Sequence, residues 1–204
     1  MVNGRSIKPG FTLFDGFLDA QEQAALLEEI RAVVAAAPLV NPMTPWGKPM
    51  SVGMTSAGRV GWITDRKGYR YEPRHPSGAV WPPIPAAALR IWRTVSNWPE
   101  DPDCMLVNFY REGAKMGLHR DADEGLFDAP VVSVSLGDPA RFRAGGLGRK
   151  DPTEALELRS GDVLVMGGPS RLAYHGVDRI SFGVSPLLKD GGRINLTMRV
   201  VKED

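Results

Sequence analysis

The 204-residue sequence predicts a mainly β fold with flanking helices, arranged as a double-stranded β-helix, or jelly roll. In its second half, short segments of alternating apolar and polar residues are separated by turns, as is typical of successive short strands. The 17 prolines and 23 glycines are many for a helical protein and favour short strands joined by turns. Helical periodicity is confined to two segments of the first half. A plain β-sandwich is the alternative fold.

The composition predicts one domain, residues 1–204, because 43% of the residues are hydrophobic and 24% are charged. The net charge of +1 gives no overall basic field, so a polyanion would have to meet a local patch. A single cysteine, Cys104, excludes an internal disulfide and fits a reducing cytosol. The sequence has no membrane-spanning apolar run and no signal-peptide pattern at its start. We therefore expect a cytoplasmic monomer without a membrane partner.

The first elements expected are an irregular arm over residues 1–17, with a strand at Gly10–Phe14, and then a helix. Asp19 can cap this helix, with Glu22 three residues later as in a capping box. Apolar residues then recur at helical spacing, namely Ala24, Leu26, Leu27, Ile30 and Val33. Pro38 ends the helix. A second helix is predicted from Pro85 to near Trp98, with proline in its first turn.

Residues 39–83 are rich in glycine and proline, with methionines and aromatic residues among them. Long segments of this kind inside compact domains are usually functional loops or lids. Trp62 and Tyr69, near Arg66 and Lys67, could stack on bases while the cations meet phosphate. From these residues alone, aromatic side chains that cover the edge of the core are the simpler explanation.

From Cys104 onward the apolar period changes to two, and residues 104–201 are expected to form the jelly-roll core. Besides the segment around His119, the predicted strands are Cys104–Tyr110, Val132–Leu136, Arg141–Ala144, Ala155–Leu158, Val163–Met166, Arg171–His175 and Arg193–Val201. A fold of this kind encloses a cavity that can hold a metal ion.

His119 and Asp121 suggest such a metal site. If their segment is a strand, residues two apart point to the same face, about 7 Å apart along the backbone. His-x-Asp alone is a weak motif, and a surface histidine beside an aspartate explains it more often. His175, expected to end a later strand, would complete two histidines and one carboxylate, the set that holds Fe(II) with open positions. Zinc, manganese or cobalt could occupy the same ligands.

The last predicted strand, Arg193–Val201, provides a second indication of a binding site. Arg193, Asn195, Thr197 and Arg199 share one of its faces, and apolar residues share the other. A solvated outer strand would explain this pattern, but arginines on an interior strand need anionic partners. A small dicarboxylate fits between them, and Asn108 and Tyr110 offer further donors. Metal ligands beside a dicarboxylate site indicate Fe(II) chemistry with 2-oxoglutarate as co-substrate.

With these residues in place, the chain resembles the AlkB family of 2-oxoglutarate-dependent dioxygenases, which repair alkylated bases of nucleic acid. The likeness covers nearly the whole chain. The matching motifs are Met50–Thr55, Gly61-Trp62, Gly68–Tyr71, Asn108–Tyr110, His119–Glu124, Val132–Gly137, Gly145–Leu147, Ser170–Leu172, Tyr174–Gly176 and Arg193–Arg199. The Arg-x-Asn-x-Thr-x-Arg pattern of the last motif, following His-x-Asp and the later histidine, is the most specific of them.

The resemblance implies that Fe(II) is held by His119, Asp121 and His175. It implies that 2-oxoglutarate is held by Arg193 and Tyr110 at its distal carboxylate, by Arg199 and Asn108 nearer the metal, and with assistance from Asn195. Residues 39–83 would form a nucleotide-recognition lid. The residues expected to bind the substrate base and its surroundings are Trp62, Tyr69, Asp123, Met54 and Arg149. No catalytic residue beyond the metal ligands is expected.

The activity implied is removal of methyl groups from bases such as 1-methyladenine and 3-methylcytosine, with release of formaldehyde, succinate and CO2. The substrate would be alkylated DNA, with RNA as a further possibility, single-stranded or flipped out of the duplex. Candidates for phosphate contact are Lys115, Arg120, Arg141, Arg149 and Lys150, for which scattered solvated charge is the equal alternative. A hydroxylase of a protein or small molecule, and a cupin-like binding protein, are the competing functions.

Two segments depart from the family pattern. Residues 45–49, Pro-Trp-Gly-Lys-Pro, differ from the expected lid, and Met166 stands where a larger aromatic residue is expected. Neither belongs to the iron or co-substrate set, so they bear on lid shape and substrate preference. His75 matches no ligand of the family and is expected to be a surface loop residue.

Overall fold

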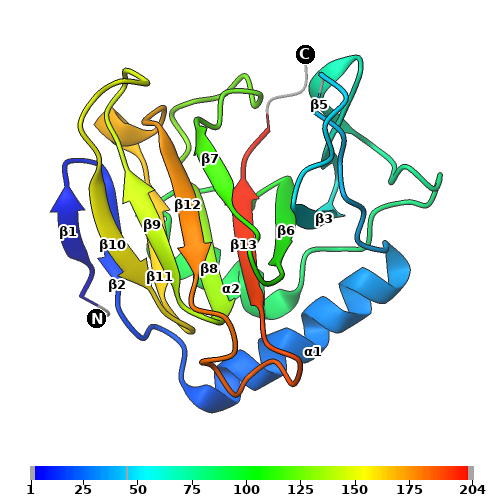
Figure 1. Cartoon of the computed structure of the whole chain (residues 1–204), viewed down its shortest axis with the longest axis horizontal. Coiled ribbons are helices and arrows are strands. Elements are labelled where there is room, and N and C mark those ends of the chain that lie inside the picture. The colour runs from blue at the N-terminus through cyan, green and yellow to red at the C-terminus, as the bar shows by residue number, and fades with distance from the viewer. Residues whose placement is uncertain (1–2, 45, 202–204) are drawn as a thin grey trace.

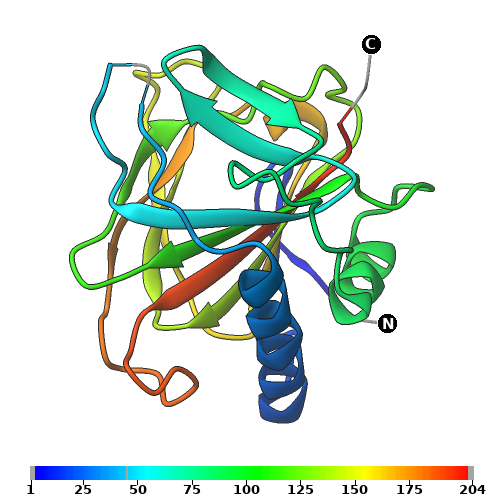
Figure 2. The ribbon, with the colours of Figure 1, turned by 90° about the vertical axis from the view of Figure 1, so that its right-hand side faces the viewer.

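Two β-sheets face one another in the computed structural model, and both helices pack on the outer face of the larger sheet (Figures 1 and 2). The structure describes residues 3–44 and 46–201, so Pro45 of the predicted lid lies outside it. The prediction of a mainly β jelly roll with flanking helices is confirmed.

The larger sheet has seven strands. Their order is β1 (Arg5–Lys8), β2 (Phe11–Phe14), β11 (Val163–Met166), β8 (Val131–Gly137), β13 (Arg193–Arg199), β6 (Cys104–Tyr110) and β3 (Val52–Gly58). The smaller sheet has four strands, in the order β10 (Glu154–Leu158), β9 (Ala140–Ala144), β12 (His175–Ile180) and β7 (Met116–His119). A separate hairpin of β4 (Gly61–Asp65) and β5 (Gly68–Glu72) lies beside the open end of the two sheets (Figure 2).

Strand β13 shows how the alternating pattern sorts side chains between the two layers. It lies between β8 and β6 and pairs antiparallel with both. Ile194, Leu196 and Met198 pack with helix residues in one core on the outer face. Arg193 and Arg199 face the other way, into the space between the sheets, where both are buried. The alternative of a solvated outer strand is therefore wrong.

Helix α1 (Ala20–Ala36) begins at Asp19 with the predicted capping box. The Asp19 carboxylate accepts the Glu22 N–H at 2.8 Å, and the Glu22 carboxylate accepts the Asp19 N–H at 2.9 Å. Its buried face is formed by Leu26, Leu27, Ile30 and Val33, whereas Ala24 is exposed. Helix α2 (Ala86–Val95) ends before the predicted Trp98. In the described part of the chain, no helix is long and apolar enough to cross a membrane.

Other local features also differ from what the sequence predicts. Strand β3 was not predicted, and it places part of residues 39–83 in the larger sheet. The predicted strand Arg171–His175 is wrong, because a 3₁₀ turn at Gly168–Ser170 (η1) and a further turn precede β12, which His175 begins. His75 is not at the surface but 4% exposed, with its ring nitrogens bonded to Ser77 and the Pro38 carbonyl.

The long connection between β12 and β13, residues 181–192, is fixed by the buried carboxylate of Asp138. That carboxylate accepts four backbone N–H groups, from Gly183, Val184 and Ser185 at 2.8 Å each and from Gly192 at 2.6 Å. Burial opposes ionisation, but these four donors lower the pKa of Asp138 below its ordinary value. One carboxylate thus joins both ends of a loop that contains no strand of its own.

Candidate active site

His119, Asp121 and His175 meet between the sheets, at the end where β7 stops and β12 starts. His119 is the last residue of β7 and lies directly opposite His175, the first residue of β12. One possible ligand atom from each of the three residues lies within 4.8 Å of the others. Asp121 is not on the strand, as the sequence argument assumed, but in the loop two residues beyond it. The pairing of β7 with β12 thus brings His119 beside His175, although they are distant in sequence, and the short loop after β7 places Asp121 next to both.

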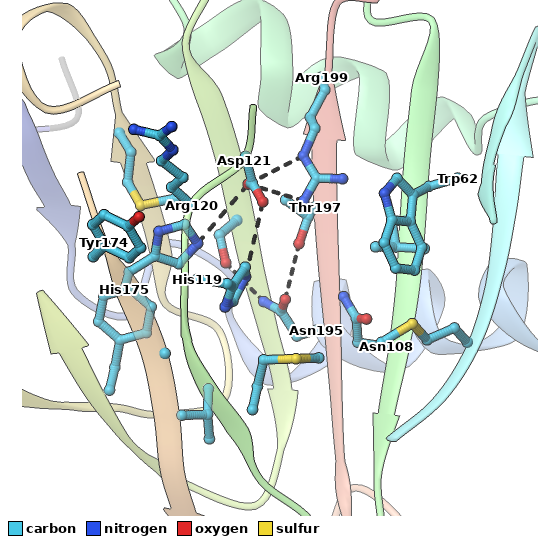
Figure 3. A pocket seen from close by; sticks show the side chains of 18 of the residues that line it. Trp62, Asn108, His119, Arg120, Asp121, Tyr174, His175, Asn195, Thr197 and Arg199 are labelled. Carbon is cyan, nitrogen blue, oxygen red and sulfur yellow. Dashed lines mark hydrogen bonds and ion pairs between the residues drawn. The ribbon is translucent and has the colours of Figure 1, made fainter. Parts of the chain in front are cut away.

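Backbone carbonyls orient both imidazoles. The Nδ1 atom of His119 lies 2.9 Å from the Gly117 carbonyl, and that of His175 lies 3.0 Å from the Ala173 carbonyl. With Nδ1–H donating to these carbonyls, each Nε2 keeps its lone pair for a metal ion. The Nε2 atoms lie 3.8 and 3.9 Å from the Asp121 carboxylate (Figure 3).

Charge and burial prepare these three groups to coordinate a cation. Burial lowers the pKa of His175 to about 4, with His119 acting in the same direction, so His175 is neutral at pH 7. Burial alone would raise the pKa of Asp121, but Arg199 and the two histidines hold it well below its ordinary value. Two imidazoles and one carboxylate with open space beside them fit Fe(II).

A buried network stands behind Asp121. Arg199 donates from Nη2 to the Asp121 carboxylate at 2.9 Å and from Nε to the same oxygen at 3.2 Å. Glu124 lies 3.3 Å from Arg199 Nε and 3.2 Å from Arg171 Nη2. Tyr71 of β5 donates its hydroxyl to Glu124 at 2.7 Å. The β4–β5 hairpin is therefore tied, through charged partners, to the loop that carries Asp121.

The inner face of β13 and the facing residues of β6 form the wall expected to bind 2-oxoglutarate. Arg193 lies opposite Tyr110, as the predicted pairing of these two residues requires. Asn108 lies opposite Asn195, between the two arginines and not beside Arg199. Asn195 already donates to the Ser133 hydroxyl at 2.7 Å and accepts from Thr197 at 3.0 Å.

Two atoms of this wall lack a hydrogen-bond partner among the described residues, although both are buried. They are Nε of Arg193 and Oδ1 of Asn108. Arg193 is 1% exposed, and it forms no ion pair within the described part of the chain. Buried polar groups are rarely left unpaired, and a buried charge is normally compensated. The unpaired Arg193 donor therefore fits an anionic ligand such as a small dicarboxylate, whereas Asn108 Oδ1 is an acceptor and would pair with a donor.

The predicted base-binding residues surround the same cavity, whose volume is about 370 Å³. Trp62 of β4 donates its indole N–H to the Asp123 carboxylate at 3.0 Å. The rings of Trp62 and Tyr69 stack, with centroids 5.5 Å apart and planes 17° apart. Met54 lines the cavity from β3 and is buried. In Figure 3, Trp62 and Tyr174 stand on opposite sides of His119 and Asp121.

The five predicted phosphate contacts are not equivalent. Arg120 and Arg149 line the cavity, with their guanidinium carbons 5.7 and 5.9 Å from the centroid of the Tyr174 ring. Lys115, Arg141 and Lys150 are exposed and do not line it. The structure therefore brings only two of the five to the mouth of the site.

The chain matches the family described as the 2OG-Fe(II) oxygenase superfamily over residues 10–199. It is 52% identical over 195 residues to the alpha-ketoglutarate-dependent dioxygenase AlkB homolog of Caulobacter vibrioides, covering 95% of this chain and 89% of that one. The chain belongs to the AlkB family. As an AlkB-family protein it is a dioxygenase that uses Fe(II), 2-oxoglutarate and O2.

Two further AlkB-family relatives agree with this assignment. The alpha-ketoglutarate-dependent dioxygenase AlkB of Escherichia coli is 45% identical over 186 residues, which cover 89% of this chain and 85% of that one. The solved structure of OsALKBH1 superposes with a TM-score of 0.78 at 31% identity and covers 97% of this chain and all of that one.

Sequence reasoning did not give roles to Glu124, Arg171 and Tyr71, although all three lie in motifs that it matched. Glu124 bonds Arg171 and Tyr71, which lie 47 and 53 residues away from it along the chain. No local spacing reports contacts of that kind. The available signal was the acidic residue that ends the His119–Glu124 motif, because Glu124 would need a cationic partner if it were buried.

Proposed function

We propose that this enzyme removes methyl groups from the pairing edge of nucleic-acid bases such as 1-methyladenine and 3-methylcytosine, a direct reversal of alkylation damage. A relative in Arabidopsis thaliana, 32% identical over 230 residues, is named a DNA N(6)-methyladenine demethylase. The observation that carries the proposal is the pair of lid aromatics, Trp62 and Tyr69, on the cavity that also contains His119, Asp121 and His175.

In this proposal His119, Asp121 and His175 hold Fe(II), and the inner wall holds 2-oxoglutarate. Bound together, the two supply an O2-dependent oxidation of the N-methyl group, which leaves as formaldehyde, with succinate and CO2 as co-products. Arg199 keeps Asp121 ionised and oriented through its two hydrogen bonds.

Arg193 and Tyr110 would bind the distal carboxylate of 2-oxoglutarate. Burial raises the pKa of Tyr110 to about 12, so its phenol stays protonated and can donate a hydrogen bond to a carboxylate. Arg193 can donate from Nε, which has no partner in the described chain. Asn108 can offer its amide between the two arginines, and Asn195, opposite it on the neighbouring strand, is held by its bond to Ser133.

The modified base would enter between Trp62 and His119, with Met54 beneath it and Asp123 near its exocyclic nitrogen. A base inside a duplex cannot reach this enclosed position, so the substrate is single-stranded or flipped out. A methyl group on the pairing edge weakens pairing and lowers the cost of flipping. DNA is the primary substrate proposed, RNA is a further one, and the enzyme works as a cytoplasmic monomer.

The test is formaldehyde release from a single-stranded oligonucleotide with one 1-methyladenine, in the presence of Fe(II), 2-oxoglutarate and ascorbate. We expect release with restoration of adenine, and neither in a control without 2-oxoglutarate. A Trp62→Ala, Tyr69→Ala variant should lose repair while it retains some uncoupled turnover of 2-oxoglutarate. If the wild type consumed 2-oxoglutarate but left the base methylated, a protein or small-molecule substrate would replace nucleic acid.

A further inference from the structure

Trp46 is the most exposed large hydrophobic side chain in the described part of the chain. Its exposed fraction is 79%, against 65% for the next residues, Val80 and Val184. Single exposed apolar residues are common on protein surfaces, but this one also lines the active-site cavity. It belongs to the segment that departs from the family pattern, so the family's known base contacts do not account for it.

The turn that carries Trp46 is held by its own hydrogen bonds. The Thr44 N–H donates to the Lys48 carbonyl at 2.8 Å, and the Gly47 N–H donates to the Thr44 carbonyl at 2.8 Å. The Lys48 N–H donates to the Thr44 hydroxyl at 3.1 Å. Gly47 has φ = 76°, a left-handed conformation that glycine adopts without steric cost. The described residues around Trp46 are therefore held by hydrogen bonds to one another.

The base of this turn is fastened to the rest of the lid. Met43 and Pro49 form an antiparallel bridge, and the Met50 N–H donates to the Pro42 carbonyl at 2.9 Å. The Thr64 hydroxyl of β4 donates to the Met43 carbonyl at 3.3 Å. Because the chain is hydrogen-bonded on both sides of the turn, little backbone entropy is lost when a flat ligand stacks on the Trp46 ring.

Positive charge lines the same cavity. Arg120 and Arg149 both lie near the ring of Tyr174, and neither forms an ion pair with another described residue. An exposed aromatic ring and unpaired guanidinium groups on one cavity suit a chain of alternating flat bases and phosphates. A purely apolar ligand would give these two arginines no anionic group to bind.

We propose that Trp46 is a second stacking platform, outside the base pocket, for the unpaired base of a nucleotide next to the modified one. Arg120 and Arg149 hold the phosphodiester between the two nucleotides. The proposal deepens the proposed function and rests on it, because it names how the flanking strand is bound. It predicts that this enzyme uses a short single strand better than an isolated nucleotide.

The decisive comparison uses two substrates, 1-methyldeoxyadenosine 5′-monophosphate and a trinucleotide with 1-methyladenine at its centre. In Trp46→Ala we expect KM for the trinucleotide to rise about tenfold, with kcat within about twofold, because base–aromatic stacking is lost. Kinetics with the mononucleotide should not change. Trp46→Phe should restore most of the loss, and Phe182→Ala, an exposed aromatic outside the cavity, is the matched control.

An unchanged KM for the trinucleotide in Trp46→Ala would overturn the proposal. So would an equal loss on both substrates, which would place Trp46 in the base pocket itself. Binding of fluorescein-labelled oligothymidylate, measured by anisotropy without turnover, separates this proposal from the demethylation proposal. A tenfold higher Kd for oligothymidylate in Trp46→Ala supports stacking on Trp46 even if no base is demethylated. Unchanged binding, with altered self-association in sedimentation, would assign Trp46 to a contact between two copies of the chain.

Discussion

Arg193 is a buried guanidinium that the folded chain leaves incompletely bonded. Its Nη2 donates to the Ser135 hydroxyl at 2.7 Å, while its Nε has no partner among the described residues. Burial lowers the pKa of Arg193 from its ordinary value, as expected for a cation without an adjacent carboxylate. The side chain is therefore arranged for an anion that arrives from solution.

We predict that Arg193→Met raises KM for 2-oxoglutarate by about 10- to 100-fold, because hydrogen bonds to a charged group contribute about 1.5–3 kcal/mol. Metal affinity should stay within about twofold, since Arg193 does not contact the three metal ligands. Succinate formation against 2-oxoglutarate concentration, with Co(II) titration of the same protein, gives both quantities. Arg179→Met, an exposed arginine of β12, is the control. An unaltered KM would contradict the assignment of Arg193.

Single residues could be identified from the sequence where their type and spacing are rare. Residues whose roles depend on partners distant in the chain could not. The His-x-Asp motif, His175 and the two arginines were recognisable because few alternatives fit their types and spacing. Tyr71 was not, because its bond to Glu124 joins β5 to a loop 53 residues later. His75 was misplaced at the surface, since nothing local predicts its bond to the Pro38 carbonyl.

Helix α1 depends on a terminus that the sequence predicts correctly. Asp19 and Glu22 each accept the backbone N–H of the other, so two donors that the helix cannot satisfy are paired. We predict that Asp19→Ala lowers the free energy of unfolding by about 1 kcal/mol, measured by urea titration. Asp19→Asn, which retains a side-chain acceptor, should lose much less. Equal losses in the two variants would show that the carboxylate charge matters more than the cap.

Elements were predictable where one face is buried and the other is not. Cys104–Tyr110 and Val163–Met166 were predicted with the bounds that the structure shows. Strand β3 was missed because six of its seven residues are buried and two are glycine, so no alternation marks it. The strand was predicted to end at His175, but β12 begins there, because a 3₁₀ turn at Gly168–Ser170 and a turn at Arg171 and Leu172 precede it.

The whole molecule should respond to pH through the buried metal site. In the metal-free protein the pKa of His175 is about 4, below its ordinary 6.5, so between these values the unfolded chain binds a proton that the folded chain does not. Stability that is complete above pH 6.5 is therefore lost as the pH falls toward 4. Asp121, whose pKa is also lowered, loses its contribution only below its ordinary value of 3.8.

We predict that the metal-free protein loses on the order of 1–2 kcal/mol of unfolding free energy between pH 7 and pH 5 through His175. Urea titrations at both pH values, after treatment with a chelator, measure this loss. His175→Gln should show a smaller loss than the wild type by that amount. A variant with the same pH dependence as the wild type would assign the effect to other groups.

The jelly roll was predictable as a class because turns recur at short intervals from Cys104 to Val201. The assignment of strands to sheets was not, since β13 pairs with β6 and β8, which precede it by more than 50 residues. The order of the seven-stranded sheet interleaves strands from both ends of the chain. The neighbours of a strand are decided by how the two sheets and the helices pack together, and the sequence of one strand does not contain that information.

The carboxylate of Asp138 has a consequence for how this protein can vary. Its partners in the described part of the chain are backbone N–H groups of the 181–192 loop, so it constrains the path of the chain and not the identity of the side chains there. Val184 illustrates this, because its N–H is held while its side chain is 65% exposed. Substitutions on the outside of this loop can therefore accumulate without displacing the two strands that present His175 and Arg193.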